Sequence, residues 1–407
     1  MSSTIKPIDE AQVLDAVVWA IKAEAPLDIV STGSKRDLGR PFQAEHTLDL
    51  SGLSGVNFYE PEELVLSAKP ATPVSQIEGL LAAKKQMLAF EPMNLGPIFG
   101  QPADRGTIGG VFACNLSGPR RIKAGAARDH LLGFNAVSGR GDPFKSGGRV
   151  VKNVTGYDLS KLITGSFGTL AVMTELTFKV LPAPEKTYTV LVAGLDDATA
   201  TAAMSRAMNS AHEVAGAAHL PADIAVASVV PYVNDAGCAI TALRLEGFGP
   251  SVEQRCRELR EELAGFGSLE ELHSRNSAVF WHEVRDATYL AEPLNRVIWR
   301  LSVPPASGHA VVAMLSRDLD VHAFYDWSGG LIWLSLPPTR GADALAVRSA
   351  IAGFGGHATL VRAPANVRAS VPVFQPQTGP MAALSGRVKD SFDPKRVLNP
   401  GRMRAGL

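Results

Sequence analysis

The chain has 407 residues, with 40 Lys and Arg against 40 Asp and Glu, and 46% of its residues are hydrophobic. This length allows two or three domains with a large buried core, and the composition excludes disordered, coiled-coil and collagen-like proteins. The balanced charge argues against a strongly basic nucleic-acid binder.

The three cysteines are far apart in the chain, and no CxxC pair occurs. The chain therefore offers no zinc site, no iron–sulfur ligand set and no disulfide framework. The N-terminal segment has the pattern of an amphipathic helix, not of a signal peptide, and no run of 18 apolar residues occurs. We expect a cytoplasmic protein, with peripheral association at the inner membrane left open through a partner.

In the N-terminal part, Asp9 followed by Gln12 predicts the start of a helix that ends before Pro26. Strands are predicted over 28–30 and 63–68. Thr72 as N-cap, with proline at the first helical position, predicts a helix to about Lys85. Alternating β-branched residues over 170–181 predict a long strand.

The sequence Leu181-Pro-Ala-Pro-Glu185 is typical of a domain boundary. The pattern beyond it predicts strand 187–193, helix 196–211, strands 223–230 and 237–245, and helix 251–264, an order typical of a split βαβ unit. Two more strands, 296–303 and 331–336, alternate with helices 305–317 and 342–352, and a last helix covers 381–392. We detect no internal repeat in the sequence.

Several common motifs are absent or misplaced. No Gly-Lys dipeptide occurs, which excludes a P-loop, and no serine has the glycine spacing of a nucleophile elbow. The GxGxxA spelling at 353–358 follows a predicted helix and precedes a predicted strand, the reverse of the dinucleotide-fold order. No histidine pattern predicts a metal site.

Glycine is concentrated in one window, because 15 of the 38 glycines lie between Gly96 and Gly168. The same window holds ten Lys and Arg against four Asp, although the whole chain is neutral. Glycine permits close backbone approach, and turn N–H groups with nearby cations can bind a phosphate.

Three glycine-bearing stretches are candidate ligand loops: 31–36 (STGSKR), 104–118 (from DRGTIGG onward) and 151–170 (from VKNVTGYDL onward). For the first, a plain turn is the competing interpretation. For the second, it is a tight packing loop, and for Tyr157 in the third it is a core aromatic.

Together, the order and spacing of these stretches resemble the FAD-binding domain of the vanillyl-alcohol oxidase, or PCMH-type, flavoprotein family over about residues 1–185. The tail from Asp393-Pro394 to Leu398-Asn399-Pro400-Gly401 is similar to the closing motif of that family. Within the family, the segment 149–159 and the chain length are most similar to the smaller flavin subunits (E subunits) of bacterial glycolate oxidases.

The resemblance implies an α+β fold. It comprises a PCMH-type FAD-binding domain of two subdomains (1–182), an α/β cap domain with ferredoxin-like, split βαβ character (183–375), and a C-terminal return to the FAD domain (376–407).

The resemblance also implies roles for individual residues. Gly33, Ser34, Gly109 and Gly110 would hold the pyrophosphate; Thr107, Asn115 and Gly118 would line the flavin; Gly156, Tyr157 and Asp158 would hold the adenine or ribitol side; Asn399 would approach the isoalloxazine; and Arg128 would face a phosphate or flavin O2.

This chain departs from the family pattern at two places. Some relatives carry a histidine that binds FAD covalently, whereas this chain has Lys35-Arg36 there, so non-covalent FAD is expected. Catalytic relatives carry a His-Gly-Asp-Gly-Asn-x-His-like motif in the cap, and none of the nine histidines here has that context. No catalytic residue and no metal site are therefore assigned.

The resulting hypothesis is an FAD-bearing subunit of a complex that oxidises glycolate to glyoxylate. A larger flavin subunit and an iron–sulfur subunit would be its partners, the latter receiving the electrons. The first alternative is a stand-alone FAD-dependent 2-hydroxy-acid dehydrogenase, with Arg244, Arg300 and Trp299 as candidate substrate contacts. The second is a non-catalytic, structural flavoprotein subunit.

Overall fold

The computed structural model describes residues 3–42, 44–149 and 156–406. The chain begins with a small three-stranded parallel sheet in the order β1 (Ser3–Ile5), β3 (His46–Asp49), β2 (Leu27–Val30). Helix α1 (Glu10–Ala23) buries its apolar face with this sheet. The predicted cap is confirmed, because the Asp9 carboxylate accepts from the Gln12 N–H at 2.8 Å.

A second, antiparallel sheet has five strands in the order β4 (Val56–Glu60), β5 (Val65–Ala68), β9 (Ala171–Lys179), β7 (Leu131–Ser138), β8 (Pro143–Gly147). Helices α2 (Val74–Ala82), α3 (Ile108–Cys114), α4 (Arg121–Ala124) and α5 (Leu159–Ile163) accompany it. The long strand predicted over 170–181 is confirmed as β9. Strands β4, β7 and β8 were not predicted from the sequence.

The predicted start of α2 is wrong in detail. Pro73, not Thr72, occupies the N-cap position. The Thr72 hydroxyl instead donates to the Lys69 carbonyl at 2.7 Å and accepts from the Gly55 N–H at 2.9 Å. Thr72 thus ties two loops together, which a local helix signal cannot reveal.

The cap is built on one eight-stranded antiparallel sheet in the order β14-β11-β13-β12-β16-β17-β15-β18. Its strands are β11 (Lys186–Ala193), β12 (Gly216–Leu220), β13 (Ile240–Gly247), β14 (Ser268–His273), β15 (Val297–Ser302), β16 (His322–Asp326), β17 (Leu331–Leu336) and β18 (His357–Arg362). Its main helices are α6 (Asp197–Met208), α9 (Gly249–Leu263), α10 (Ser274–Asp286), α11 (Gly308–Leu315) and α12 (Ala344–Ala352).

The cap contains an internal duplication that the sequence did not reveal. The chain runs β11-α6-β12-β13-α9-β14 and then β15-α11-β16-β17-α12-β18, so a βαββαβ unit occurs twice. The two units meet where the second strands pair, His219 opposite Tyr325. The expected ferredoxin-like character is confirmed in both units. The expectation that the chain has no internal repeat is wrong.

The strand predicted over 223–230 is also wrong. That stretch contains the short helix α7 (Ala222–Ala225), and α8 (Pro231–Asn234) follows it. The true strand, β12, precedes Pro221 and consists mainly of small residues that are buried on both faces. Because polar and apolar residues do not alternate along such a strand, β12 could not be predicted from the sequence periodicity.

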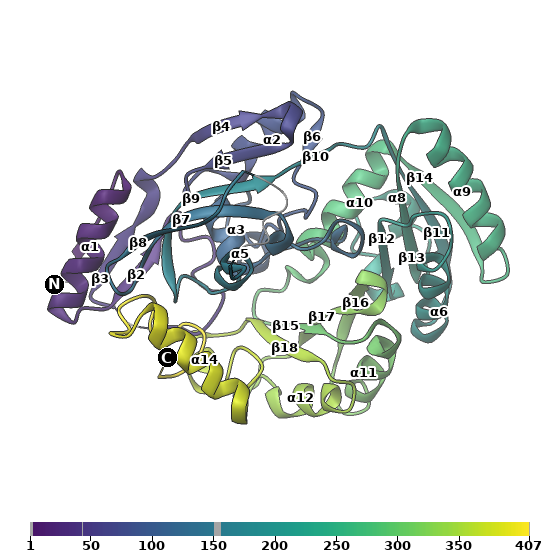
Figure 1. The fold of residues 1–407 in the computed structure, drawn as a ribbon. Helices are drawn as coiled ribbons and strands as arrows, with labels where there is room; N and C mark the ends of the chain where they lie inside the picture. The colour runs from purple at the N-terminus through teal and green to yellow at the C-terminus, as the bar shows by residue number, and fades with distance from the viewer. Residues whose placement is uncertain (1–2, 43, 150–155, 407) are drawn as a thin grey trace.

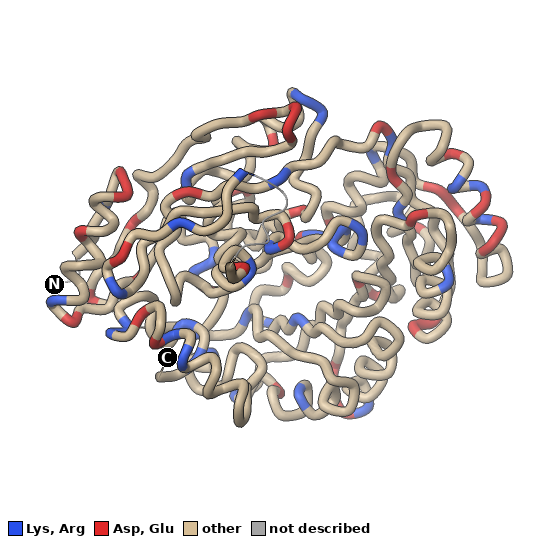
Figure 2. The backbone as a smooth tube through the Cα atoms, viewed as in Figure 1, with Lys and Arg blue, Asp and Glu red and all other residues tan. Residues whose placement is uncertain are grey.

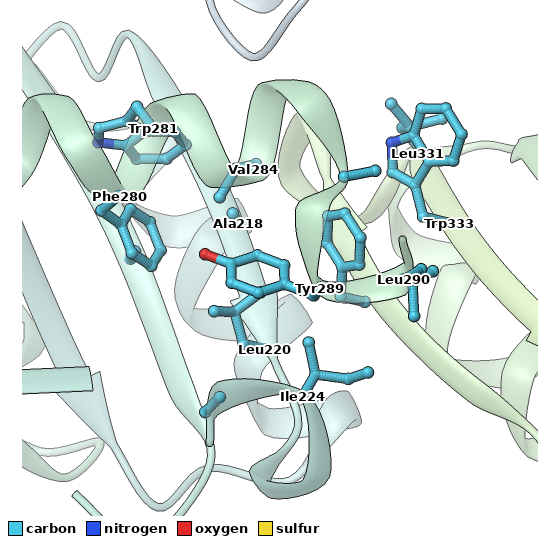
Figure 3. Close-up of a cluster of buried hydrophobic side chains, with 14 of the residues drawn as sticks. Ala218, Leu220, Ile224, Phe280, Trp281, Val284, Tyr289, Leu290, Leu331 and Trp333 are labelled. Carbon is cyan, nitrogen blue, oxygen red and sulfur yellow. The ribbon is translucent and has the colours of Figure 1, made fainter. Parts of the chain in front are cut away.

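Alternation along the cap strands separates two faces of the sheet. On β15, Val297, Trp299 and Leu301 pack with α11 and α12 on the outer face. Ile298 belongs to the opposite, inner core with α10 and residues of the N-terminal half such as Ile98. Figure 3 shows part of this inner core, including Phe280, Trp281 and Tyr289. The inner face is therefore the one that meets the N-terminal half.

The C-terminal segment returns to the N-terminal half. Helix α14 (Gly379–Phe392) leads to a tail that pairs with β2, because Leu27 N–H donates to the Val397 carbonyl at 2.8 Å. Figure 1 shows the yellow C-terminal helix on the same side of the molecule as the purple N-terminus. The buried Lys389 ammonium lies 2.6 Å from the Asp393 carboxylate, and this ion pair fixes the course of the returning segment.

Candidate cofactor-binding site

A cleft with about 820 Å³ of empty volume lies between the small parallel sheet, α3 and the start of β9. Four stretches far apart in the chain line it: 28–36, 107–114, 167–173 and 399–402. Six of the predicted ligand residues are among the lining residues: Gly33, Ser34, Thr107, Gly109, Gly110 and Asn399. The fold thus brings together residues of all three glycine-bearing stretches and of the C-terminal tail, which are far apart in the chain.

The turn after β2 presents its backbone to the cleft. Gly33 has φ +72°, and an added Cβ would meet no atom within 4 Å, so the turn is open towards the cleft. In the described part of the chain, the N–H groups of residues 32–35 donate to no protein acceptor. The buried Ser31 hydroxyl also lacks a hydrogen-bond partner among these residues. Unpaired donors of this kind fit an anionic ligand such as a pyrophosphate.

Lys35 adds a positive charge to this turn. Its ammonium lies 3.4 Å from the Ser34 hydroxyl and forms no ion pair within the described residues. Burial lowers the pKa of Lys35. A desolvated, unpaired cation gains more from a bound phosphate than an exposed lysine would.

Arg402 reaches the cleft from the C-terminal tail. Its guanidinium donates to the Lys35 carbonyl at 2.8 Å, and this hydrogen bond stabilises the turn after β2. Burial lowers the pKa of Arg402 to about 10. The tail therefore contributes a cation as well as Asn399.

The stretch 107–110 opens helix α3. The Thr107 hydroxyl caps the helix by accepting from the Gly110 N–H at 3.4 Å. The Gly109 N–H donates to the Pro70 carbonyl at 2.8 Å, and a Cβ on Gly109 would lie 2.6 Å from Pro70 Cβ. Gly109 is therefore needed for close packing, while Gly110 approaches the Lys35 side chain.

Asn399 joins the tail to both sides of the cleft. Its side-chain oxygen accepts from the Ile29 N–H, and its amide nitrogen donates to the Phe167 carbonyl, both at 2.8 Å. Gly168 has φ +68°, and a Cβ there would come within 2.8 Å of the Asn399 amide nitrogen. Asn399 thus holds β2 and the loop before β9 at a fixed separation.

Three predicted residues lie outside the cleft lining. Asn115 ends α3 in the left-handed conformation, and its side chain accepts from the Arg128 N–H at 3.2 Å. Arg128 itself is exposed. Gly118 packs against Glu91 and Arg285 at the boundary with the cap, and its carbonyl accepts from the Trp327 indole at 3.0 Å.

The predicted adenine-side residues Gly156, Tyr157 and Asp158 are exposed and also lie outside the lining. The Tyr157 side chain is 93% exposed, so it is not a core aromatic. Asp158 caps α5 by accepting from the Lys161 N–H at 3.1 Å. Residues 150–155 of this motif lie outside the described residues. Ligand contact by these three residues stays a prediction.

A buried charge network ties the N-terminal half to the cap. Glu91 accepts from the Arg244 guanidinium at 2.8 and 3.0 Å and from the Arg120 N–H at 2.6 Å. Arg120 in turn binds Glu246 through two hydrogen bonds of 2.8 Å. Burial alone would raise the pKa of Glu91, but the two arginines outweigh it and hold that pKa at about 2.

This network decides between the cap residues considered as substrate contacts. Arg244 donates two hydrogen bonds to Glu91 and is 1% exposed. Trp299 is fully buried on the outer face and donates to the Ala342 carbonyl at 2.9 Å. Arg244 and Trp299 are therefore structural in this fold, whereas the guanidinium of the third candidate, Arg300, forms no hydrogen bond or ion pair with the described residues. Within this part of the chain, no cluster of three or more His, Cys, Asp or Glu could hold a metal.

Comparison with known proteins places these features in a family. Residues 2–147 match the FAD binding domain family. The chain is 35% identical to glycolate oxidase subunit GlcE of Escherichia coli (strain K12) over 396 residues, covering 97% of each chain. The chain belongs to the GlcE family of glycolate oxidase subunits. As in that family, the N-terminal half is an FAD-binding domain.

Other relatives of this GlcE-family chain match shorter regions. Glycolate oxidase subunit GlcD of Bacillus subtilis is 42% identical over 97 residues, covering 23% of this chain and 21% of that protein. A D-lactate dehydrogenase of Archaeoglobus fulgidus is 39% identical over 142 residues, 32% of each chain. Together with the FAD binding domain, the similarity to these hydroxy-acid oxidoreductases makes the chain an FAD-dependent oxidoreductase by homology.

The fold has PCMH-type neighbours. p-Cresol methylhydroxylase matches with a TM-score of 0.69 and 14% identity, covering 98% of this chain and 88% of that one. 4-Ethylphenol oxidase from Gulosibacter chungangensis matches with a TM-score of 0.67 and 15% identity, with the same coverage. The expected α+β, PCMH-type fold is confirmed. No helix in the described part is long and apolar enough to cross a bilayer.

The cleft of this GlcE-family chain fits FAD. The open turn 32–35, the unpaired Ser31 hydroxyl and the Lys35 ammonium suit the pyrophosphate, and apolar Phe167, Ala171 and Met173 extend the lining. Neither Lys35 nor Arg402 was among the predicted cofactor-binding residues, although Lys35 lies in the predicted 31–36 loop. The sequence did contain a signal for each, because Lys35 follows Gly33-Ser34 and Arg402 follows Asn399 in the tail. Only the fold places both side chains on one cleft.

Proposed function

We propose that this chain is the FAD-bearing subunit of a complex that oxidises glycolate to glyoxylate. The observation that carries the proposal is the 35% identity to E. coli GlcE over 97% of both chains. Such end-to-end similarity covers the cap and the tail as well as the FAD-binding domain, so the chain preserves the whole architecture of a glycolate oxidase subunit.

In this proposal, the chain's own residues bind and orient the cofactor. The N–H groups of 32–35 and the Lys35 ammonium hold the pyrophosphate, and Asn399 fixes the spacing of the strands around it. Bound FAD supplies the capacity to accept the two electrons that glycolate loses with its α-hydrogen and hydroxyl proton. The predicted residues outside the cleft lining (Asn115, Gly118, Arg128, Gly156, Tyr157 and Asp158) remain proposed FAD contacts.

We also propose that FAD is bound non-covalently. The lining of the cleft in the described residues contains no His or Tyr, and burial raises the pKa of its Cys114 thiol to about 11. A thiol with so high a pKa is a poor nucleophile at neutral pH. Acid precipitation should therefore release all flavin into the supernatant, whereas flavin that stays in the protein pellet contradicts non-covalent binding.

Two subunit partners complete the proposal. A larger flavin subunit and an iron–sulfur subunit assemble with this chain, and electrons leave through the latter. Three separate cysteines, without a ligand motif, give this chain no cluster of its own. Any association with a membrane runs through such a partner. The division into 1–182, 183–375 and 376–407 is our proposal for the domain limits.

The function is tested by anaerobic titration with glycolate. The isolated chain should bind FAD, seen as absorbance near 450 nm, and glycolate should not bleach it. The assembled complex should reduce an artificial electron acceptor with glycolate, and omission of this chain should abolish that activity. Failure of the isolated, folded chain to bind FAD would contradict the proposal.

One observation favours the alternative of a stand-alone 2-hydroxy-acid dehydrogenase. Arg300 on the inner face of the cap lies over the Trp327 ring, forms no hydrogen bond or ion pair with the described residues, and could bind a carboxylate. Bleaching of the isolated chain's flavin by glycolate or D-lactate would establish this alternative. A complex that is fully active when this chain carries no FAD would instead indicate a structural subunit.

A further inference from the structure

Helix α13 (Ala365–Ser370) of the cap lies against the segment that directly follows the turn 32–35. The Arg368 guanidinium donates to the Asp37 carboxylate at 3.0 Å and to the Gly39 carbonyl at 2.9 Å. Arg368 is 5% exposed, and Asp37 is the only carboxylate that pairs with it among the described residues. A displacement of this segment would therefore leave a buried positive charge without its counter-ion, which costs free energy.

Two further contacts hold the same segment to the cap. The Arg40 guanidinium donates to the Ala369 carbonyl at 2.9 Å, so hydrogen bonds with α13 run in both directions. Leu38 is 5% exposed and belongs to the inner core together with residues of α10. Its N–H donates to the Lys35 carbonyl at 3.1 Å. Because this hydrogen bond joins the segment to the turn 32–35, the cap restrains the turn as well.

The cap also touches the opposite wall of the FAD cleft. Phe374 follows α13, and its ring centre lies 4.9 Å from that of Phe167, which lines the cleft. Strand β18 fixes this part of the cap, because the Leu360 N–H donates to the Val373 carbonyl at 2.8 Å. The cap segment 368–374 thus contacts both sides of the cofactor cleft.

Several cations meet at this end of the cleft. Figure 2 shows Lys and Arg positions beside the C-terminus, where the tail returns to the N-terminal half. Burial lowers the pKa of Arg402, and the nearby charge of Arg368 adds to this lowering. Like charges held together cost free energy, and a bound pyrophosphate would offset that cost. FAD should therefore stabilise the arrangement in which α13 lies against the turn.

We propose that α13, through Arg368, positions the turn 32–35 for FAD and couples FAD binding to the docking of the cap. Arg368 does not itself line the cleft, so it is a positioning residue. FAD should hold the cap in place, and the docked cap should raise the affinity for FAD by the same factor. The inference rests on the proposal that the turn 32–35 holds the pyrophosphate, and it gives the cap a role in cofactor binding.

The first test is the FAD affinity of the full chain, measured by flavin fluorescence titration. Arg368→Met should weaken FAD binding about tenfold or more, because the turn loses its charge-assisted hydrogen bonds to the cap and is less preorganised. Arg362→Met is the matched control, since Arg362 is also a buried arginine of the cap, 7% exposed. Within the described residues it donates only to backbone carbonyls, and none of these belongs to a residue that lines the cleft. It should lower the thermal midpoint but leave the FAD affinity unchanged.

Hydrogen exchange over residues 365–371 is a readout that a purely structural role would not move. FAD should slow this exchange about threefold or more in the wild type and in Arg362→Met, because it favours the docked cap. FAD should not slow it in Arg368→Met. Unchanged exchange on addition of FAD to the wild type, or equal slowing in Arg368→Met, would overturn the proposal.

Lys35→Met distinguishes this proposal from the one on which it rests. If Lys35→Met and Arg368→Met both keep the wild-type FAD affinity, the assignment of the pyrophosphate to the turn fails, and the coupling fails with it. If only Lys35→Met weakens FAD binding, the coupling alone is overturned.

A milder variant covers the case in which Arg368→Met does not fold. Asp37→Asn removes the charge of the same ion pair from its outer side, where the Asp37 side chain is 49% exposed. It should weaken FAD binding about threefold. Wild-type FAD affinity in Asp37→Asn would then count against the proposal.

Discussion

Replacement of Glu91 by glutamine tests the buried network that joins the two halves. The Glu91 side chain is 12% exposed and pairs with Arg244, whose side chain is 2% exposed. Glutamine keeps the shape of glutamate but removes the charge, and its amide NH2 would face a guanidinium. Arg244 would then remain buried beside Trp281, and its remaining carboxylate neighbour would be Glu246 at 3.7 Å, which is already bound to Arg120.

The magnitude follows from the pKa. A carboxyl whose pKa falls from 4.5 to about 2 on folding contributes about 3 kcal/mol at neutral pH. Removing one partner of a buried ion pair costs roughly 3–5 kcal/mol of stability in other proteins. We therefore expect Glu91→Gln to reduce the free energy of unfolding by about 3 kcal/mol at pH 7, by the same linkage.

The sign of the pH dependence follows from the lowered pKa. Above pH 4.5 the carboxyl is ionised in both states, and its full contribution is present. As the pH falls towards 2, the unfolded chain takes up a proton first, and the contribution is lost. At about pH 3 the difference between wild type and Glu91→Gln should be less than half of its value at pH 7.

The assay is urea unfolding followed by tryptophan fluorescence at both pH values. Glu213→Gln is the control, because Glu213 also faces two cations, Lys123 at 3.4 Å and Arg255 at 3.8 Å, but its side chain is 64% exposed. Exposed pairs contribute less than about 1 kcal/mol, so this variant should unfold close to the wild type. Equal unfolding of Glu91→Gln and wild type at pH 7, or a difference that persists undiminished at pH 3, would refute the reasoning.

Three further predictions concern FAD binding, and flavin fluorescence titration measures the FAD affinity in each. Lys35→Met should weaken FAD affinity by about tenfold to a hundredfold, because it removes a charge-assisted contact. The thermal midpoint of the apoprotein should stay unchanged or rise. A lower midpoint would indicate that Lys35 has a structural role. Asn399→Ala should lower both FAD affinity and the thermal midpoint, since it removes the bonds to Ile29 and Phe167, and an unchanged midpoint would contradict the spacing role. Tyr157→Ala should weaken FAD about threefold to tenfold if the exposed ring stacks on the adenine, while unchanged affinity would remove Tyr157 from the site.

The sequence by itself determined the local features of this protein. The helix cap at Asp9, the long strand before Lys179 and the turn chemistry around Gly33 depend on neighbouring residues, so pattern reasoning could identify them. The order and spacing of the glycine loops also indicated an FAD-binding domain, through their resemblance to the PCMH-type flavoprotein family.

Only the tertiary structure decided which of these features act together. Arg402 and Lys35 are 367 positions apart yet share one cleft wall, and the tail reaches β2 only because the buried Lys389–Asp393 pair fixes its course. Likewise, Arg244 and Arg300 are equivalent in sequence, as arginines on apolar strands. Glu91 neutralises the first, and no described carboxylate pairs with the second. The difference arises from the partner that each meets across the boundary, and contacts between distant segments are what a local pattern cannot encode.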